Sequence, residues 1–193
     1  STTAPTLSPE LEDWATSLAP STTTYWKLLD QQAREAPSLV AGTELTEPFE
    51  IHETGIRYLA SFQSGYSQGI FLDQRENRIR VRDRCQAGDT VLNTFAYTGA
   101  FSICAALSGA TTTTLDLSQP YLDWARENML LNRIDAQSQH FCRGDTFHWL
   151  RRFARQDRHF TGIVLDPPTF SRDHRGKIFR AEEHYGELVA LAA

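Results

Sequence analysis

The stretch Val91-Leu-Asn-Thr-Phe-Ala-Tyr-Thr-Gly99 decides the fold of this chain. Its first residues are apolar or β-branched and predict a buried strand over residues 90–95. The small-residue run that follows, residues 100–108, predicts a helix. Gly99 occupies the tight turn between these two elements, where a backbone without a side chain can approach a ligand closely. The stretch therefore predicts a β-α unit with a ligand-facing turn.

Strands and helices alternate through the rest of the chain. The apolar patterns predict helices over residues 71–84, 120–132, 146–154 and 181–192, and further strands over residues 112–117, 140–142 and 162–165. This order predicts an α/β fold with a doubly wound, mainly parallel sheet that binds its ligand at the carboxyl ends of the strands. Four such strands can be recognised before Ala193, so we expect the chain to be truncated after the fourth strand of its fold.

The residues before this pattern are expected to form accessory elements. A helical patch over residues 7–18 follows a tail rich in Ser, Thr and Pro, and a helix over residues 25–36 is expected to stop at Pro37. Apolar residues alternate on both sides of Thr54-Gly55, a turn dipeptide typical of β-hairpins. We therefore expect an N-terminal helix and a β-hairpin ahead of the main domain.

The composition is that of an ordinary globular domain. The 193 residues are 40% hydrophobic and 22% charged, which excludes collagen, coiled coil and wholesale disorder. No apolar stretch approaches the roughly 18 residues of a membrane helix, so we expect a soluble, cytoplasmic protein without membrane contact. Cys85, Cys104 and Cys142 are too scattered for a disulfide framework or a zinc site, and we expect no metal.

The charge pattern bears on nucleic-acid binding. The net charge of −5 argues against a protein that coats nucleic acid by bulk electrostatics. However, every basic residue except Lys27 and Lys177 is arginine. Arginine binds phosphate bidentately and stacks on bases, which favours discrete RNA contacts. An equally open interpretation is that these arginines lie on ordinary solvated helix faces.

Polar residues gather at the ends of the predicted strands. Asp116 follows Gly99 by seventeen residues, about the spacing at which a carboxylate binds a ribose diol in doubly wound folds. Asp145 follows the third strand, and Asp166-Pro-Pro follows the fourth, where two prolines fix a rigid, extended turn. For Asp116, the alternative is a carboxylate that only interacts with a helix dipole. For the two prolines, the alternative is a stiff loop without a ligand. The G-x-G-x-x-G fingerprint and the phosphate-loop Lys are absent, which disfavours dinucleotide and nucleoside-triphosphate ligands.

Four segments together resemble a known family. Asn93-Thr-Phe-Ala-Tyr-Thr-Gly, Leu115-Asp-Leu-Ser, Gly144-Asp and Asp166-Pro-Pro-Thr-Phe-Ser resemble, in order and spacing, motifs I to IV of class I S-adenosylmethionine-dependent methyltransferases. The segment 65–78 is similar to the one that precedes motif I in a subgroup of 23S ribosomal RNA methyltransferases, which modify guanine N7 or cytosine C5. The resemblance covers residues 49–193. It implies a Rossmann-like class I fold, an enzyme of class EC 2.1.1, S-adenosylmethionine as cofactor with S-adenosylhomocysteine as product, and ribosomal RNA as partner.

Together with the local patterns, the resemblance leads us to expect three segments of the chain, the first of which lies outside the resemblance. Residues 1–47 would be an N-terminal tail and helix, residues 48–70 a β-hairpin accessory element, and residues 71–193 the S-adenosylmethionine-binding domain, incomplete at its carboxyl end.

The cofactor-binding residues that the resemblance implies lie mostly at the strand ends. Residues 93–99 would form the loop beneath the methionine moiety, Asp116 would bind the ribose hydroxyls, and Asp145 would meet the adenine amino group. Asp73 and Arg75 would fasten the methionine end or brace motif I, with a surface ion pair as the alternative. The full set is Asp73, Arg75, Asn93, Phe95, Tyr97, Thr98, Gly99, Asp116, Leu117, Ser118, Gly144, Asp145 and Asp166.

Catalytic and RNA-binding residues are expected around the proline turn. The catalytic candidates are Asp166, Pro167, Pro168 and Phe170, of which the first three would lie beside the sulfonium and the entering base while Phe170 stacks on a base. The basic residues just after the turn would grip flanking phosphates; they are Arg172, Arg175, Lys177 and Arg180.

The acceptor atom is inferred from the cysteines. Guanine N7 carries an accessible lone pair, whereas methylation at cytosine C5 requires a cysteine that adds to C6. Cys85, Cys104 and Cys142 all lie where buried thiols are expected, so the chain favours guanine N7 over cytosine C5. Two other functions stay open: a methyltransferase for a protein or a small molecule, and a non-catalytic module that binds S-adenosylmethionine or RNA.

Overall fold

The computed structural model describes residues 7–18, 22–27, 36–63, 67–172 and 178–193. The chain divides into two compact units. The first comprises Ser1–Ile51 and Leu59–Ile70, and the second comprises His52–Tyr58 and Phe71–Ala193. The strand ends that carry the four motifs all belong to the second unit.

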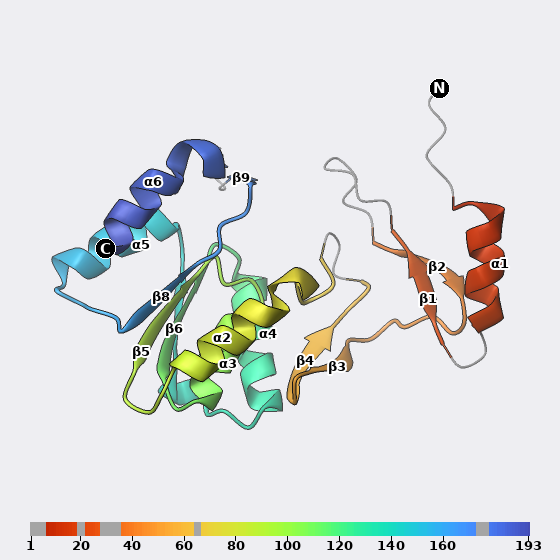
Figure 1. Ribbon diagram of the computed structural model, residues 1–193, viewed down its shortest axis with the longest axis horizontal. Helices are drawn as coiled ribbons and strands as arrows, with labels where there is room; N and C mark the ends of the chain where they lie inside the picture. Colours follow the sequence, from red (N-terminus) through yellow and green to blue (C-terminus); the bar gives the residue numbers. More distant parts are fainter. Residues whose placement is uncertain (1–6, 19–21, 28–35, 64–66, 173–177) are drawn as a thin grey trace. The chain divides into compact units, whose positions relative to one another are not determined.

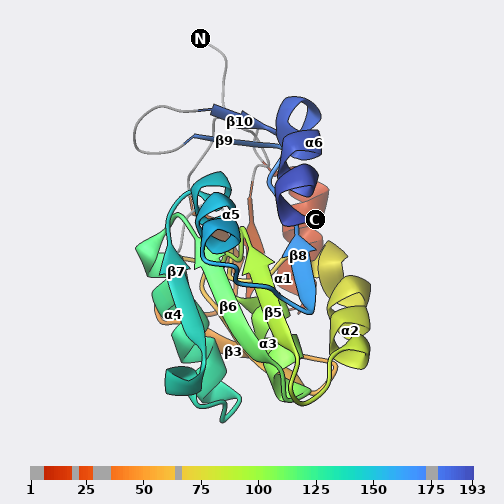
Figure 2. The ribbon, with the colours of Figure 1, turned by 90° about the vertical axis from the view of Figure 1, so that its left-hand side faces the viewer.

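A four-stranded parallel sheet forms the centre of the second unit. Its strands are β5 (Thr90–Thr94), β6 (Thr111–Asp116), β7 (His140–Arg143) and β8 (Gly162–Leu165). Figure 1 labels β5, β6 and β8, and Figure 2 shows all four strands in the order β7-β6-β5-β8. The register pairs Asn93 of β5 with Thr114 of β6 on one side and with Val164 of β8 on the other. The chain therefore runs outward from β5 to β7 and then returns to the opposite side of β5. The predicted doubly wound sheet is confirmed, with every strand within one residue of its expected bounds.

Helices cover both faces of this sheet, as Figure 2 shows. Successive residues of a strand point to opposite faces, and β5 illustrates the division. Val91 packs with Ala105 on the face that carries α2 (Arg75–Arg84), α3 (Ala100–Leu107) and α4 (Gln119–Leu131). Leu92 packs on the other face, against α5 (Thr146–Arg155) and α6 (Ala181–Ala192). The predicted helix over residues 71–84 begins instead with a 3₁₀ turn, Leu72–Gln74, and continues as α2.

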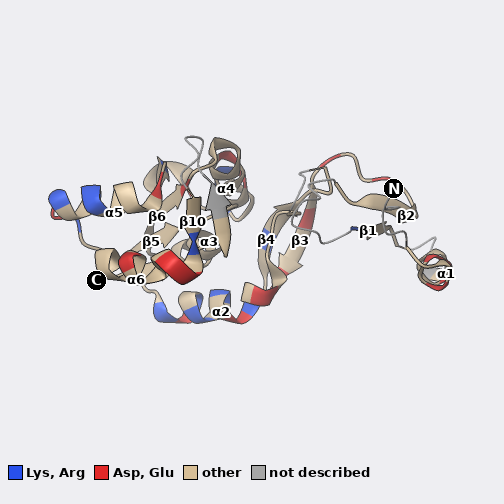
Figure 3. Ribbon diagram, turned by 90° about the horizontal axis from the view of Figure 1, so that it is seen from above, with Lys and Arg blue, Asp and Glu red and all other residues tan. Residues whose placement is uncertain are grey.

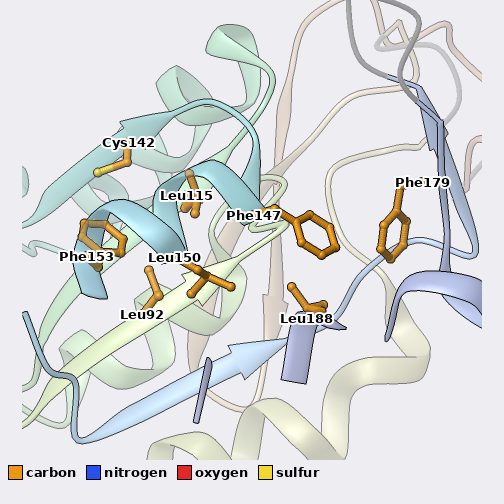
Figure 4. Close-up of a cluster of buried hydrophobic side chains, with 8 residues drawn as sticks. All are labelled: Leu92, Leu115, Cys142, Phe147, Leu150, Phe153, Phe179 and Leu188. Carbon is orange, nitrogen blue, oxygen red and sulfur yellow. The ribbon is translucent and has the colours of Figure 1, made fainter. Parts of the chain in front are cut away.

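The larger core cluster lies on the face of α5 and α6 (Figure 4). It joins one side chain from each of β5, β6 and β7 with a stripe along α5 and with single residues of α6 and of β10 (Ile178–Arg180). The members are Leu92, Leu115, Cys142, Phe147, Leu150, Phe153, Phe179 and Leu188. Because β10 and α6 contribute buried apolar side chains, the segment after the proline turn packs on the sheet.

The segment after the proline turn contains a hairpin that the sequence did not reveal. β9 (Phe170–Arg172) pairs antiparallel with β10, and Phe170 lies opposite Arg180. The Phe179 ring lies 5.6 Å from the Phe95 ring and 6.0 Å from the Phe147 ring, measured between centroids. Strands this short carry no periodic signal, and this tertiary aromatic contact fixes their position.

In the first unit, the expected helix over residues 25–36 is wrong at its start. β1 (Thr24–Trp26) pairs antiparallel with β2 (Ser38–Ala41), and residues 28–35 lie outside the described part of the chain. The Tyr25 hydroxyl accepts a hydrogen bond from the Leu45 N–H at 2.6 Å, and the Tyr25 ring lies 4.1 Å from the Phe62 ring. These contacts from distant residues override the local helix pattern. The other expected helix is present as α1 (Pro9–Leu18).

The predicted β-hairpin is confirmed. β3 (Phe49–Glu53) and β4 (Ile56–Ala60) form a two-stranded sheet joined by Thr54 and Gly55. Both turn residues have positive φ, 53° and 80°, as the tight primed turns of hairpins require.

No helix in the described part of the chain has the length and apolar character needed to cross a membrane.

Candidate functional site

The predicted polar residues lie together at the carboxyl edge of the sheet. β5, β6, β7 and β8 run parallel, so the residues at their ends share one edge. In chain order these residues are Asn93, Asp116, Gly144-Asp145 and Asp166. The strand order brings Asp116 and Asp166 to opposite sides of β5.

Asn93 is buried beneath this edge, with 1% of its surface exposed. Its Nδ2 donates to Ser102 Oγ at 3.0 Å, and Ser102 Oγ also accepts a hydrogen bond from Thr114 Oγ1 at 2.8 Å. Asn93 Oδ1 is buried without a hydrogen-bond partner among the described residues. A buried acceptor left in this state costs about 1–3 kcal/mol. A bound ligand that donated an N–H to this oxygen would remove that cost.

The loop between β5 and α3 has a strained backbone. Phe95 and Tyr97 both have φ of 51°, a left-handed conformation that costs a side-chain-bearing residue about 1–3 kcal/mol. Thr98 is fully buried, and Gly99 follows with φ of 78°. A Cβ on Gly99 would lie 2.7 Å from the Ala125 Cβ, so the close packing of this loop on α4 requires glycine. Strain of this kind concentrates at ligand sites.

Asp116, at the carboxyl end of β6, also fixes the strained loop through hydrogen bonds. Its Oδ2 accepts a hydrogen bond from the Tyr97 N–H and its Oδ1 from the Ser118 N–H, both at 2.8 Å. Burial raises the pKa of Asp116, while backbone hydrogen bonds from Ser118, Tyr97 and Leu117 act in the opposite direction. The sequence predicted a ribose ligand for this carboxylate but did not reveal its bond to the Tyr97 N–H.

An aromatic cluster that the sequence analysis missed lies beside Asp116. The Tyr97 ring lies 5.2 Å from the Phe71 ring, 4.6 Å from the Tyr121 ring and 6.4 Å from the Trp124 ring. Burial and the charge of Asp116 raise the pKa of Tyr121. Trp124 Nε1 is buried and has no partner in the described part of the chain. Tyr121 and Trp124 are three residues apart on α4, a spacing that could have predicted a shared face.

Asp145 caps a helix in the structure. Its Oδ1 accepts a hydrogen bond from the His148 N–H at 2.9 Å, which fixes the start of α5. Gly144 N–H donates to the Asp116 carbonyl at 2.9 Å, so the β7 loop is tied to the end of β6. The contact of Asp145 with an adenine amino group stays a prediction.

Asp166 is joined to the segment that precedes α2. Its Oδ1 accepts a hydrogen bond from Gln74 Nε2 at 3.2 Å. Burial and the nearby charge of Asp73 raise the pKa of Asp166, and the charge of Arg78 acts in the opposite direction. The structure thus brings Asp73 close to Asp166. Arg75 is exposed at the first residue of α2, and no ion pair joins it to Asp73 in the described part of the chain.

The residues after Asp166 are more exposed. Pro167 is half-buried, Pro168 is exposed, and 52% of the Phe170 surface is accessible, which leaves its ring available for stacking. Arg180 lies opposite Phe170 in the β9–β10 hairpin, but its Nη1 donates to Glu183 Oε1 at 3.0 Å, so part of its charge is neutralised.

The remaining RNA-binding candidates lie on β9 or in the segment that follows it. Arg175 and Lys177 lie outside the described residues, and of Arg172 only the backbone, on β9, is described. Their RNA-binding role stays a prediction.

The donor set of this edge fits S-adenosylmethionine. The Asp116 carboxylate can accept hydrogen bonds from ribose hydroxyls, and the unpartnered Asn93 Oδ1 can accept one from an ammonium group. The described residues contain no group of three or more His, Cys, Asp or Glu side chains placed to hold a metal ion.

Comparison with known proteins gives the family. A model of the S-adenosylmethionine-dependent methyltransferase family matches residues 10–183. Ribosomal RNA large subunit methyltransferase I of Aeromonas salmonicida is 38% identical over 160 residues, which cover 82% of this chain and 40% of that protein. Ribosomal RNA large subunit methyltransferase K of Neisseria meningitidis is 39% identical over 130 residues, which cover 67% of this chain and 36% of that protein.

A solved structure agrees with the family model. The crystal structure of SMU.776 in complex with S-adenosylhomocysteine (SAH) matches with a TM-score of 0.75 and 33% identity, over 81% of this chain and 41% of that one. This chain spans about 40% of the length of the curated relatives that it matches. The predicted resemblance, the Rossmann-like fold and S-adenosylmethionine as the family's cofactor are confirmed. The chain belongs to the S-adenosylmethionine-dependent methyltransferase family.

Proposed function

We propose that this protein methylates a base of large-subunit ribosomal RNA in the cytoplasm, with guanine N7 favoured over cytosine C5. The match to two ribosomal RNA large subunit methyltransferases supports the substrate class. The observation that carries the proposal is the carboxyl edge of the sheet, where the buried Asn93 Oδ1 lacks a partner beside a strained loop that Asp116 holds.

The chain's own residues would bind and orient the cofactor. Asn93 and the loop Phe95–Gly99 would hold the methionine end, and Asp116 would accept hydrogen bonds from the ribose hydroxyls. Leu117 and Ser118 would flank the adenine, with Gly144-Asp145 beside its amino group. S-adenosylmethionine, when bound, supplies a methyl group on a positively charged sulfur.

The residues of the proline turn would position the acceptor base. Asp166, Pro167 and Pro168 would border the entering base, and the exposed Phe170 ring would stack on it. Guanine N7 already carries the lone pair that attacks the methyl carbon, so in-line placement can supply most of the catalysis without a general base.

The cysteines of this chain support a nitrogen acceptor. Attack on cytosine C6 needs a thiolate, and burial raises the pKa of Cys85, Cys104 and Cys142. Cys104 also contacts the Tyr58 hydroxyl at 3.5 Å inside the core, and Cys85 follows α2 at the opposite edge of the sheet from Asp116. These properties favour a nitrogen acceptor over one that needs a cysteine nucleophile.

Cofactor binding is tested by calorimetric titration of SAH into the parent chain and two variants. Asp116→Asn removes the charge that would accept the ribose hydroxyls, and we expect at least about a tenfold loss of affinity, since a hydrogen bond to a charged group contributes about 1.5–3 kcal/mol. Asp123→Asn, on the exposed surface of α4, is the matched control and should bind like the parent. Equal affinity of the parent and Asp116→Asn would refute the assigned site.

The acceptor is tested by methyl transfer from labelled S-adenosylmethionine to unmethylated large-subunit ribosomal RNA. The product RNA is digested to nucleosides, and mass spectrometry against standards distinguishes N7-methylguanosine from C5-methylcytidine. Recovery of C5-methylcytidine would overturn the preference for N7. Label in protein or in small molecules, with none in RNA, would identify a methyltransferase of another substrate class, and SAH binding without transfer to any of the three would indicate a binding module.

A further inference from the structure

A concave site lies along the outer edge of β7, away from the strand ends described above. It is a groove of about 550 Å³ between α4, the beginning of β7 and the second half of α5. β7 is the outermost strand on this side of the sheet (Figure 2). The chemically notable lining residues are Arg126, His140, Phe141, Trp149, Arg152 and Arg158, and we call this surface the basic-aromatic groove. Among the described residues, its lining contains no Asp or Glu.

Each arginine of the groove lies over an aromatic ring. The guanidinium carbon of Arg126 lies 4.2 Å from the centre of the Phe141 ring, and that of Arg152 lies 4.7 Å from the Trp149 ring. The guanidinium carbon of Arg158 lies 5.0 Å from the centre of the Phe153 ring, and Arg158 Nη2 donates to Thr113 Oγ1 at 2.8 Å. These contacts hold the guanidinium groups in place before any ligand binds, so less side-chain entropy remains to be lost on binding.

The arginines keep most of their charge and hydrogen-bonding capacity. Arg126 donates to Asp123 Oδ1 at 2.7 Å, which uses one of its five N–H donors. In the described part of the chain no carboxylate forms an ion pair with Arg152 or Arg158. The positive charges of both act on the buried Cys142 thiol, where they oppose the rise of its pKa that burial causes. The groove is thus locally positive in a chain of net charge −5. Figure 3 shows the basic residues that end α5.

This chemistry matches single-stranded RNA. A guanidinium that rests on an aromatic ring leaves its other face for a nucleobase, and its N–H fork suits a phosphate. The groove also offers the side-chain amides of Gln137, Gln139 and Gln156, which can bond the edges of unpaired bases. A double-stranded segment would present only its backbone to such a narrow surface, whereas unpaired bases can enter it.

We propose that the basic-aromatic groove binds a single-stranded segment of RNA separate from the base that enters the methylation site. The choice of RNA rests on the proposed function, but the groove shares none of the residues assigned to the cofactor. Trp149 connects the two regions, because it lines the groove and its Nε1 donates to the Arg143 carbonyl next to Gly144. RNA held in the groove would therefore pass close to the β7 loop of the cofactor site.

The test measures binding of a fluorescently labelled, roughly 12-nucleotide single-stranded RNA by anisotropy at several salt concentrations. The double variant Arg126→Ala/Arg152→Ala removes two phosphate contacts. It should lower the slope of log K against log salt by about 1.4, which corresponds to about a 14-fold weaker affinity at about 0.15 M salt. The matched control, Arg80→Ala/Arg155→Ala, removes the same charge from exposed positions of α2 and α5 outside the groove, and its affinity should change less than about twofold.

Three outcomes would overturn the proposal. One is equal weakening in both double variants, and another is a folded parent chain that does not bind the RNA. The third is displacement of the RNA by polyglutamate as efficiently as by unlabelled RNA, which would indicate an acidic protein partner instead. SAH titration into the groove variant, expected to match the parent, shows that the fold is intact. If RNA binding depends on the groove but the protein transfers no methyl group, the proposed function is refuted and the groove proposal stands.

Discussion

A buried ion pair between the β3–β4 hairpin and α2 makes a sharp prediction. Arg78 donates from Nε and Nη2 to the two oxygens of Glu53 at 2.8 and 2.7 Å, and from Nη1 to the Phe71 carbonyl at 2.8 Å. The exposed fractions of the two side chains are 3% for Arg78 and 10% for Glu53. Neither charge can therefore turn to water when its partner is removed.

Arg78→Met keeps the aliphatic stem and removes the guanidinium, which leaves the Glu53 carboxylate buried and unpaired. Breaking a buried pair in this way costs about 3–5 kcal/mol of unfolding free energy. For a chain of this size the melting temperature should fall by about 6–20 °C. Urea unfolding followed by circular dichroism measures the loss directly.

Two further variants make this prediction refutable. Arg80→Met, on the exposed side of the same helix, should change the stability by no more than about 0.5 kcal/mol. The double variant Glu53→Met/Arg78→Met should regain most of the loss, because an apolar pair carries no desolvation penalty. If Arg78→Met costs no more than Arg80→Met, or if the double variant is less stable than Arg78→Met, the buried pair does not have the energetic role assigned to it.

Three other perturbations test the site and the core. Gly99→Ala should lose about 2–4 kcal/mol of unfolding free energy, because it adds left-handed strain and a contact of 2.7 Å with Ala125. Gly186→Ala, in open space on α6, should gain about 0.5–1 kcal/mol, and thermal unfolding of both variants would show whether the difference exists. Leu188→Ala should cost about 2–5 kcal/mol by chemical denaturation, and a loss below about 1 kcal/mol would mean that α6 does not pack on the sheet. Burial raises the pKa of Asp116 above 3.8, so its protonation on acidification should weaken SAH binding at a higher pH than an exposed carboxylate would. A raised folded-state pKa means that protonation of this group does not itself destabilise the fold. Calorimetry of Asp116→Asn should show no such dependence of SAH binding on pH.

Part of the candidate site could be predicted because its signals are local. The turn at Gly99 and the polar residues after each strand are read from neighbouring residues, and parallel strands necessarily bring their carboxyl ends to one edge. The bond from the Tyr97 N–H to Asp116 and the proximity of Asp73 to Asp166 could not be predicted, since each joins residues from separate elements.

The sequence by itself determined the alternation of strands and helices, the hairpin turn at Thr54-Gly55 and the polar strand ends, because these depend on periodicity and on turn chemistry over a few residues. Only the tertiary structure decided that Tyr25 lies in a strand, since its ring packs on Phe62 from another part of the chain. It likewise decided which arginines are exposed. On α2, Arg78 is buried against Glu53 while Arg80 faces water, and no local pattern separates two identical side chains on one helix when the partner lies 25 residues away.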